Sequence, residues 1–372
     1  MADESTTSGP PLERIHSLFT IDEIHQQPDR VVYVGEPRVD PDVAARELWP
    51  VFHDAGWDLE VTRRRGQYAL VATRQSLGVD GVPWKHLLLF VATLLSTLFA
   101  GAFWYQLDPI ANPVDALRAW PFAAALLFVL GVHEMGHYVA SRYHRVDASL
   151  PYFIPVPTLI GTLGAVIKMD GRMPSRKALF DIGVAGPLAG LAATVLVTVV
   201  GLHLDPVHAP AEVVDSADAI ELRIGYPLLL EGLAAVFGQS LYRGDATTMV
   251  NPVVIAGWVG MLITFLNLIP AGQLDGGHIL RSMLGPAQET VAALVPGALL
   301  ALAGYLYFVS GYGGQAVSIW IIWGVLTTLV AAAGPVHPVV EQRLGWRRLA
   351  VGIVTFGLGV LCFVPVPFEI VS

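Results

Sequence analysis

The stretch "LLFVLGVHEMGHYVASRYHR" (residues 126–145) decides both the fold class and the chemistry. It is apolar enough to enter a lipid bilayer, yet it carries two histidines and a glutamate. His133 and His137 are four positions apart, so on a helix they share one face and can direct their rings to one zinc ion. Glu134 lies beside them. Ionisable side chains inside membrane helices are costly and usually functional, which argues against a chance match.

The composition places the whole chain in a membrane. Of its 372 residues, 54% are hydrophobic and only 14% are charged. A bilayer-spanning helix needs about 20 mainly apolar residues. Windows without Asp, Glu, Lys or Arg reach about that length at residues 86–107, 182–204, 246–274, 290–340 and 349–368.

We therefore predict a mainly α fold, a polytopic transmembrane helical bundle of about seven spans plus re-entrant elements. A small N-terminal α+β soluble domain precedes it. The expected spans are residues 86–107, 117–141, 182–204, 252–270, 290–309, 315–334 and 348–367.

Three parts are expected along the chain: a flexible arm (1–30), a cytosolic α+β module (31–85) and a transmembrane domain that carries the two histidines and the glutamate (86–368). Within the module, "VVYVG" predicts a strand and Pro41 the first turn of a helix. The alternating stretch 57–73 predicts a hairpin that turns near Gly66. No apolar segment with a basic leader precedes residue 86, so the first span is expected to direct insertion.

The charge balance argues against a nucleic-acid partner, because 31 acidic residues face 22 basic ones. Only three residues are lysines, an archaeal-like composition that suits a high-salt cytoplasm, although arginine-rich coding would explain it equally well. The single cysteine, Cys362, excludes an intramolecular disulfide and is expected to be a packing residue.

Basic residues predict the orientation by the positive-inside rule. Segment 142–177 carries six basic residues and loop 335–348 carries three, whereas segment 205–222 carries none. We expect the N-terminus in the cytoplasm and, by extension, a multi-pass protein of the cell membrane. The apolar stretch 226–242 is short and contains Glu231, so we predict a re-entrant or interfacial helix there.

A catalytic zinc site usually takes three protein ligands, so a third must lie at the same depth. Asp275 follows the span 252–270 and arrives near the cytoplasmic end in this topology. The rivals are weaker. Glu341 lies in a basic loop, His144 follows the zinc helix, and His278 is placed to orient the ligand carboxylate or to cap its helix.

"HEMGH" together with "NLIPAGQLDGG" resembles the site-2 protease family of intramembrane zinc metalloproteases. Its HExxH and NxxPxxxxDG patterns are matched in full, with Asn267, Pro270, Asp275 and Gly276 at the family's positions. The resemblance extends over residues 86–366. "IGTLGAVIKM" is also similar to the branch of plastid ethylene-dependent gravitropism-deficient and yellow-green proteases.

The resemblance implies one Zn²⁺ held by His133, His137 and Asp275, with Glu134 as the base that takes a proton from the attacking water. Asn267 would stabilise the oxyanion, unless it only caps its helix. Membrane lipid and a transmembrane protein substrate are the implied partners.

Gly161 and Gly164 are implied substrate-binding residues, although a turn would explain both. They lie in a segment with three prolines (150–171) that cannot form one continuous helix. We predict a re-entrant loop there, whose extended edge pairs with an unwound substrate. Closely spaced small residues at 183–190 are expected to pack helices together, with Asp181 as the cap of that span.

Three functions remain in competition. The first is an intramembrane endopeptidase that releases cytosolic fragments. The second is a membrane zinc protease that trims soluble tails, like the prenyl-protein proteases, whose ExxxD pattern is not found near a suitable span. The third is a non-catalytic metal-binding transporter or scaffold, which would have no use for Glu134.

Overall fold

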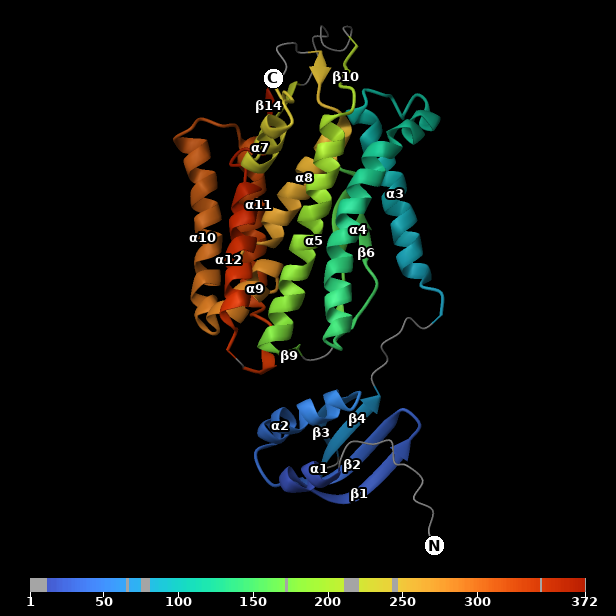
Figure 1. The fold of residues 1–372 in the computed structure, drawn as a ribbon, viewed down its shortest axis with the longest axis vertical. Helices are drawn as coiled ribbons and strands as arrows, with labels where there is room; N and C mark the ends of the chain where they lie inside the picture. Colours follow the sequence, from blue (N-terminus) through green and yellow to red (C-terminus); the bar gives the residue numbers. More distant parts are fainter. Residues whose placement is uncertain are drawn as a thin grey trace.

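The computed structural model describes two regions, a small sheet module and a helical bundle (Figure 1). The described residues are 12–64, 67–74, 81–170, 173–210, 221–242, 247–341 and 343–371.

The N-terminal module is a four-stranded antiparallel sheet with strand order β1-β2-β4-β3. Helix α2 packs against it through buried Leu48, Trp49 and Phe52. The predicted strand, helix and hairpin are confirmed, while the hairpin turn at Gly66 lies outside the described residues. The elements are α1 (Leu12–Leu18), β1 (Phe19–Gln27), β2 (Arg30–Pro37), α2 (Pro41–Asp54), β3 (Trp57–Arg64) and β4 (Gln67–Arg74).

The prediction of a flexible arm over residues 1–30 is wrong for residues 12–30. These form α1 and the edge strand β1, whose pairing with β2 runs from Phe19 to Gln27. Eight of the nine β1 residues are exposed or half-buried, so the strand shows no apolar alternation. An edge strand with polar side chains has the composition of a loop, because only its backbone is satisfied by the sheet.

Among the described residues, the helical bundle contains five helical segments long and apolar enough to cross a membrane. They are α3 (Trp84–Trp104), η1 with α4 (Pro113–Ala119 and Trp120–Tyr143), α5 (Arg176–Leu202), α10 (Ala287–Phe308) and α11 (Gly314–Ala332). Two more predicted spans are the 16-residue helices α8 (Pro252–Asn267) and α12 (Trp346–Leu361). At 1.5 Å per residue each is about 24 Å long, shorter than a bilayer core of about 30 Å. The chain is a membrane protein with a mainly helical fold.

The short helix α8 ends inside the bundle, so the polar residues at its end and after it lie in the interior. It ends at Asn267, and residues 268–274 turn the chain into α9 (Asp275–Leu284). Helix α8 packs against α4 and α5 at the centre of the bundle, and 13 of its 16 residues are buried. Helix α7 (Leu228–Val236) has nine residues and is too short to cross a bilayer, which agrees with the interfacial helix predicted there.

The predicted non-helical segment after α4 forms a β-hairpin, β6 (Tyr152–Pro155) and β7 (Thr162–Val166). Strand β6 packs mainly against α3, and β7 also contacts α4. The remaining short strands are β5 (Asp147–Ala148), β8 (Met169–Asp170), β9 (Met173–Ser175), β10 (Val207–His208), β11 (Glu221–Ile224), β12 (Thr248–Met249), β13 (Pro338–Val340) and β14 (Phe368–Val371). They pair as β5–β8, β9–β13, β10–β12 and β11–β14.

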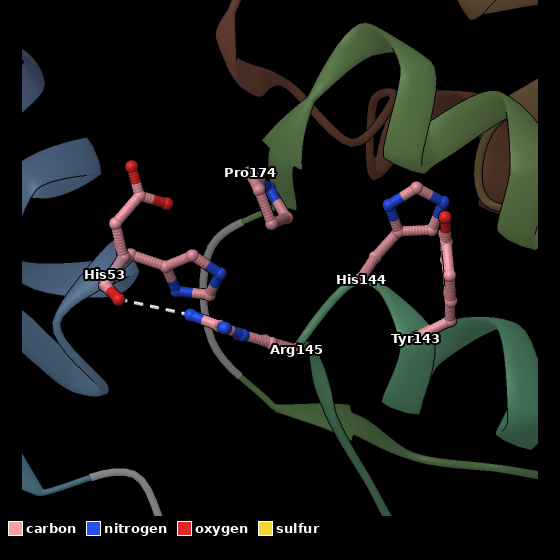
Figure 2. Close-up of a pocket in the computed structure, with 6 residues that line it drawn as sticks. His53, Tyr143, His144, Arg145 and Pro174 are labelled. Atoms are coloured by element: carbon pink, nitrogen blue, oxygen red, sulfur yellow. Dashed lines mark hydrogen bonds between the residues drawn. The ribbon is translucent and has the colours of Figure 1, made fainter.

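The module lies beyond the end of the bundle where α4 ends and α5 begins (Figure 1). The guanidinium of Arg145, just after α4, donates a hydrogen bond to the carbonyl of Asp54 at the end of α2 (3.0 Å). His53 and His144 line the same open pocket between the two regions (Figure 2). The described residues of the basic segments 142–177 and 335–348 lie at the same end of the bundle, because Arg348 pairs with Asp181 and β13 pairs with β9.

Candidate metal centre

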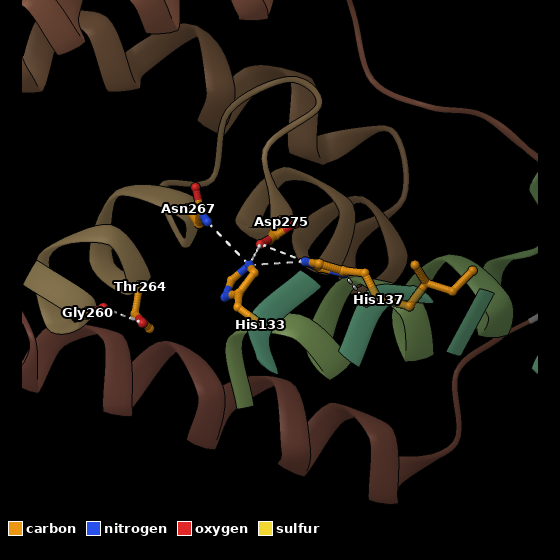
Figure 3. Close-up of polar contacts among 7 residues, drawn as sticks. His133, His137, Gly260, Thr264, Asn267 and Asp275 are labelled. Carbon is orange, nitrogen blue, oxygen red and sulfur yellow. Dashed lines mark hydrogen bonds and ion pairs between the residues drawn. The ribbon is translucent and has the colours of Figure 1, made fainter. Parts of the chain in front are cut away.

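Three helix segments bring the predicted site residues together (Figure 3). Helix α4 carries His133, Glu134 and His137 along one face. The first residue of α9 is Asp275, and the last residue of α8 is Asn267. The loop between α8 and α9 folds back, so both residues face α4 although they lie more than 130 positions along the chain.

The two imidazoles and one carboxylate converge on a single point. Nε2 of His133 and Nε2 of His137 are 3.2 Å apart, and each is 3.2 Å from Oδ2 of Asp275. Both histidines are buried. Within the described ranges these side chains are the one group of histidine, cysteine or acidic residues whose donor atoms are close enough to hold a metal ion.

The spacing fits zinc. In a tetrahedral site with Zn–N and Zn–O bonds of about 2.0–2.1 Å, neighbouring donor atoms are about 3.3 Å apart. The three observed separations are all 3.2 Å, so the donors occupy three corners of such a tetrahedron. Two imidazoles and a carboxylate with one open corner are also a typical donor set of catalytic zinc.

A backbone carbonyl fixes the His137 ring. Nδ1 of His137 lies 2.9 Å from the carbonyl oxygen of Ile182 in α5, and since a carbonyl can only accept, Nδ1 carries the proton. Nε2 is then the free donor atom that faces Asp275. Such a bond to the outer ring nitrogen orients a metal-binding histidine.

Glycines of α5 make room for the two rings. A Cβ at Gly186 would lie 2.0 Å from Nε2 of His137, and a Cβ at Gly190 would lie 2.8 Å from Nδ1 of His133. On α4, a Cβ at Gly136 would meet the carbonyl oxygen of Ala185 at 2.5 Å. The small residues at 183–190 were predicted to pack helices. Two of them, Gly186 and Gly190, pack against the metal-site imidazoles themselves, a contact that no local sequence pattern indicates.

The Glu134 side chain is buried beside the two histidines. Its carboxylate lies within reach of the backbone N–H of Ile167, just after β7. Ile167 was not among the predicted site residues. This contact places the end of the hairpin next to the residue predicted to act as the base.

Asn267 points its amide at the site. Its Nδ2 lies 3.3 Å from Nε2 of His133, so the side chain faces the converging donor atoms (Figure 3). A side chain that only capped α8 would turn back toward the helix. An amide donor at this position can bind a developing negative charge on a substrate oxygen.

The two predicted substrate-binding glycines differ. At Gly161 (φ +81°) a Cβ would lie 2.5 Å from the Ser96 carbonyl oxygen, so this residue packs against α3 at the turn of the hairpin. At Gly164 (φ +108°) a Cβ would meet no atom within 4 Å, although the residue is buried. Only Gly164 adjoins free space, and the turn explains Gly161.

The other residues considered as metal ligands or as their partners lie away from the point on which the three donor atoms converge. His278 is buried one turn after Asp275, but it makes no hydrogen bond to the three donor residues in the described part of the chain, where its Nδ1 has no hydrogen-bond partner. Glu341 pairs with buried Arg281 (2.8 Å), and His144 pairs with Asp181 (3.0 Å).

Two known proteins are similar to this chain over two thirds or more of its length. A "Probable zinc metalloprotease EGY1, chloroplastic" from Oryza sativa subsp. japonica is 34% identical over 74% of this chain and 47% of that protein. A "Probable zinc metalloprotease EGY2, chloroplastic" from Arabidopsis thaliana is 32% identical over 67% of this chain and 42% of that protein. The chain thus spans about half the length of these relatives.

Among solved structures, the "Site-2 Protease from Methanocaldococcus jannaschii" is similar over 68% of this chain and 93% of that chain, with 17% identity and a TM-score of 0.34. The profile of "Peptidase family M50" matches residues 121–306, half of the chain, including all the motif residues described above. The resemblance carried by the two motifs is confirmed: the chain belongs to peptidase family M50.

Proposed function

We propose that the chain is an intramembrane zinc metalloendopeptidase that cleaves membrane proteins in or near their transmembrane segments. The observation that carries this is the triangle of 3.2 Å separations between His133, His137 and Asp275, with Glu134 buried beside it. The zinc metalloprotease names of the relatives support it.

Each site residue then has a role that follows from its position. Zinc held by the three side chains supplies Lewis-acid chemistry, making water acidic near neutral pH and polarising a carbonyl. Glu134 takes the proton of the attacking water, and it lies within reach of the Ile167 N–H. The Asn267 amide donates to the oxygen on which negative charge develops.

The hairpin supplies a way to hold the substrate. Among the described strands, β7 pairs with β6 alone, so its other edge is not covered by a strand. A transmembrane helix must unwind before its peptide bonds can be hydrolysed, and an added strand satisfies the exposed backbone groups. Gly164 on β7 adjoins free space, and Ile167 just beyond it touches Glu134.

The finer organisation follows the same proposal. Residues 86–368 form the protease domain, with α8 and α12 completing seven membrane segments, and the elements from α1 to β4 form a cytosolic module. The N-terminus and the metal site then lie toward the cytoplasmic side of the cell membrane, because the basic segments gather at that end. Cleavage there releases cytosolic fragments of the substrate.

The test is Glu134→Gln in the full-length chain, purified in detergent beside the wild type. We expect about one zinc ion per chain in both proteins by elemental analysis, and cleavage of a reconstituted single-span substrate only by the wild type. Expressed in cells, the variant should also accumulate uncut substrate, which quantitative membrane proteomics would identify.

A matched control is Glu231→Gln, which removes a carboxylate from the apolar helix α7 and should leave cleavage intact. Unchanged cleavage by Glu134→Gln, or a wild type without stoichiometric zinc, would overturn the proposal. The first of these results would favour a metal-binding transporter or scaffold.

A further inference from the structure

A cluster of polar side chains joins three helices beyond the metal site. Arg348 of α12 donates two hydrogen bonds to Asp181 of α5, from Nε to Oδ1 and from Nη2 to Oδ2, both 2.8 Å. Nε2 of His144, at the end of α4, lies 3.0 Å from Oδ2 of the same carboxylate. All three side chains are partly shielded, with exposed fractions of 37%, 26% and 18% for Arg348, Asp181 and His144.

Asp181 is not the helix cap that the sequence predicts. Ser175 caps α5, accepting from the backbone N–H of Ala178 (3.1 Å), and Asp181 lies further into the helix. Its side chain is therefore free to join the neighbouring helices. A two-bond contact between a guanidinium and a carboxylate fixes orientation as well as distance.

The next residue in the chain carries the bond that orients a metal-site ring. Ile182 follows Asp181, and its carbonyl accepts from Nδ1 of His137 (2.9 Å). Asp181 and this carbonyl belong to consecutive residues of one rigid helix. A rotation or slide of α5 that moves the carboxylate also moves the carbonyl.

The contact between α4 and α5 leaves little tolerance for such movement. A Cβ at Gly186 would already overlap the His137 ring at 2.0 Å, so the ring lies directly against the α5 backbone. A small change in the register of α5 either breaks the Ile182 bond or pushes the ring toward Asp275.

We propose that Asp181, clamped by Arg348 and His144, is a positioning residue that sets the register of α5 against α4 and thereby the orientation of His137. The inference rests on the proposed zinc site. It adds contacts of Asp181 that help to orient His137 and that belong to neither the HExxH nor the NxxPxxxxDG motif. The clamp acts at a distance from the metal, through a backbone carbonyl.

The experiment uses the full chain with Asp181→Asn, Arg348→Gln and Arg348→Lys. Zinc affinity is measured by competition with a chromophoric chelator, and ligand geometry by the visible absorption of the cobalt-loaded protein. Loss of a residue that orients a metal ligand weakens binding by about 10- to 100-fold. We expect about a tenfold loss for Asp181→Asn and Arg348→Gln, with an altered cobalt spectrum, and partial recovery for Arg348→Lys.

The matched control is Glu341→Gln, which weakens a contact of the same 2.8 Å length with Arg281 but adjoins no carbonyl bonded to a metal-site ring. It should keep wild-type zinc affinity and the wild-type cobalt spectrum. Thermal melting of all variants checks folding, and Arg348→Gln carries the test if Asp181→Asn does not fold.

Wild-type affinity and spectrum in both Asp181→Asn and Arg348→Gln would overturn the inference, as would equal losses in Glu341→Gln. A wild type that binds no zinc would instead overturn the proposed function. The two failures are therefore distinguished by the wild-type measurement alone.

Discussion

The helix pair α4–α5 and the hairpin β6–β7 both approach the candidate metal centre through glycine, but in opposite ways. At Gly186 the missing side chain is replaced by the His137 ring, with an added Cβ only 2.0 Å from Nε2. At Gly164 nothing lies within 4 Å of the same position, and φ is +108°. Gly186 allows a protein side chain to occupy the position of its missing Cβ, whereas Gly164 leaves that position empty.

In the proposed intramembrane protease, this difference separates two tasks. The helix contact must be closed, because the donor atoms have to stay at fixed distances from one another. The hairpin must leave room, because an unwound substrate has to approach the base. Substitutions in the first region should affect zinc, and those in the second should affect cleavage with zinc in place.

Gly186→Ala should have the largest effect. The new methyl group would overlap the His137 ring, so either the ring or α5 must move, and Nε2 leaves its 3.2 Å contact with Asp275. We expect zinc affinity to fall at least about 100-fold, with loss of all cleavage. Chelator competition and a cleavage assay measure the two losses.

Gly304→Ala is the control for this change, since it adds a methyl group to α10 where nothing lies within 4 Å. A glycine replaced by alanine inside an open helix face should cost nothing, or stabilise by up to about 1 kcal/mol. Full zinc binding by Gly186→Ala would mean that the closed contact does not set the metal geometry.

Gly164→Val should abolish cleavage while zinc stays bound. A β-branched residue is strained at φ +108° by about 1–3 kcal/mol and would fill the free space beside β7. We expect at least a tenfold loss of cleavage with unchanged zinc content, measured on the same preparation.

Gly311→Val is the control, because Gly311 (φ +77°) also has nothing within 4 Å but lies in the connection between α10 and α11. It carries a similar strain far from the hairpin. Equal losses in both variants would show that strain alone, and not the space at Gly164, lowers cleavage.

The sequence predicts which residues form this site better than it predicts the contacts that hold those residues in place. His133 and His137 are one helical turn apart whatever the tertiary fold, and the topology brings Asp275 to the same depth. The register of α5 against α4 follows from long-range packing, so the contact of Gly186 with a metal-site ring was seen only as a small-residue pattern. The clamp between Asp181 and Arg348 joins residues 167 positions apart and leaves no local pattern.

The same limit explains the errors elsewhere. Strand β1 has too few buried side chains to show a two-residue period, so residues 12–30 were predicted to be an arm. The length of α8 was overestimated because residues 268–270 are apolar, although Pro270 and the contacts of Asn267 end the helix earlier. Gly161 and Gly164 look alike in sequence, and only their neighbours distinguish them.

Gly161→Ala should have an intermediate effect on cleavage, and it should act by lowering the stability of the protein. Its Cβ would lie 2.5 Å from the Ser96 carbonyl oxygen and 2.6 Å from Cα of Thr97, so the hairpin must shift away from α3. Overpacking of this kind costs about 1–3 kcal/mol. We expect a lower melting temperature and a partial loss of cleavage, with zinc retained.

Gly238→Ala is its control, with φ +64° and no atom within 4 Å of the added Cβ. It should shift the melting temperature less than Gly161→Ala. If Gly161→Ala melted like the wild type yet lost cleavage completely, Gly161 would contact the substrate after all, and the two glycines of the hairpin would share one role.

The smallest effect is expected from Thr162→Val, which tests whether the hairpin must be rigid as well as open. The Thr162 hydroxyl donates to the Ile154 carbonyl (2.8 Å) and accepts from the Gly164 N–H (3.0 Å), so it ties β6 to β7 beside the free space. Valine has the same shape, and each lost hydrogen bond is worth about 0.5–1.5 kcal/mol.

We expect Thr162→Val to reduce cleavage less than tenfold, mainly by raising KM, because a looser edge strand binds an unwound substrate less well. Thr355→Val removes a similar buried hydroxyl from α12, where it bonds only its own helix (2.8 Å), and should leave KM unchanged. A fall in kcat at constant KM would instead mean that the hydroxyl affects Glu134 through the hairpin's end at Ile167, since substrate binding would then be intact while the base is misplaced.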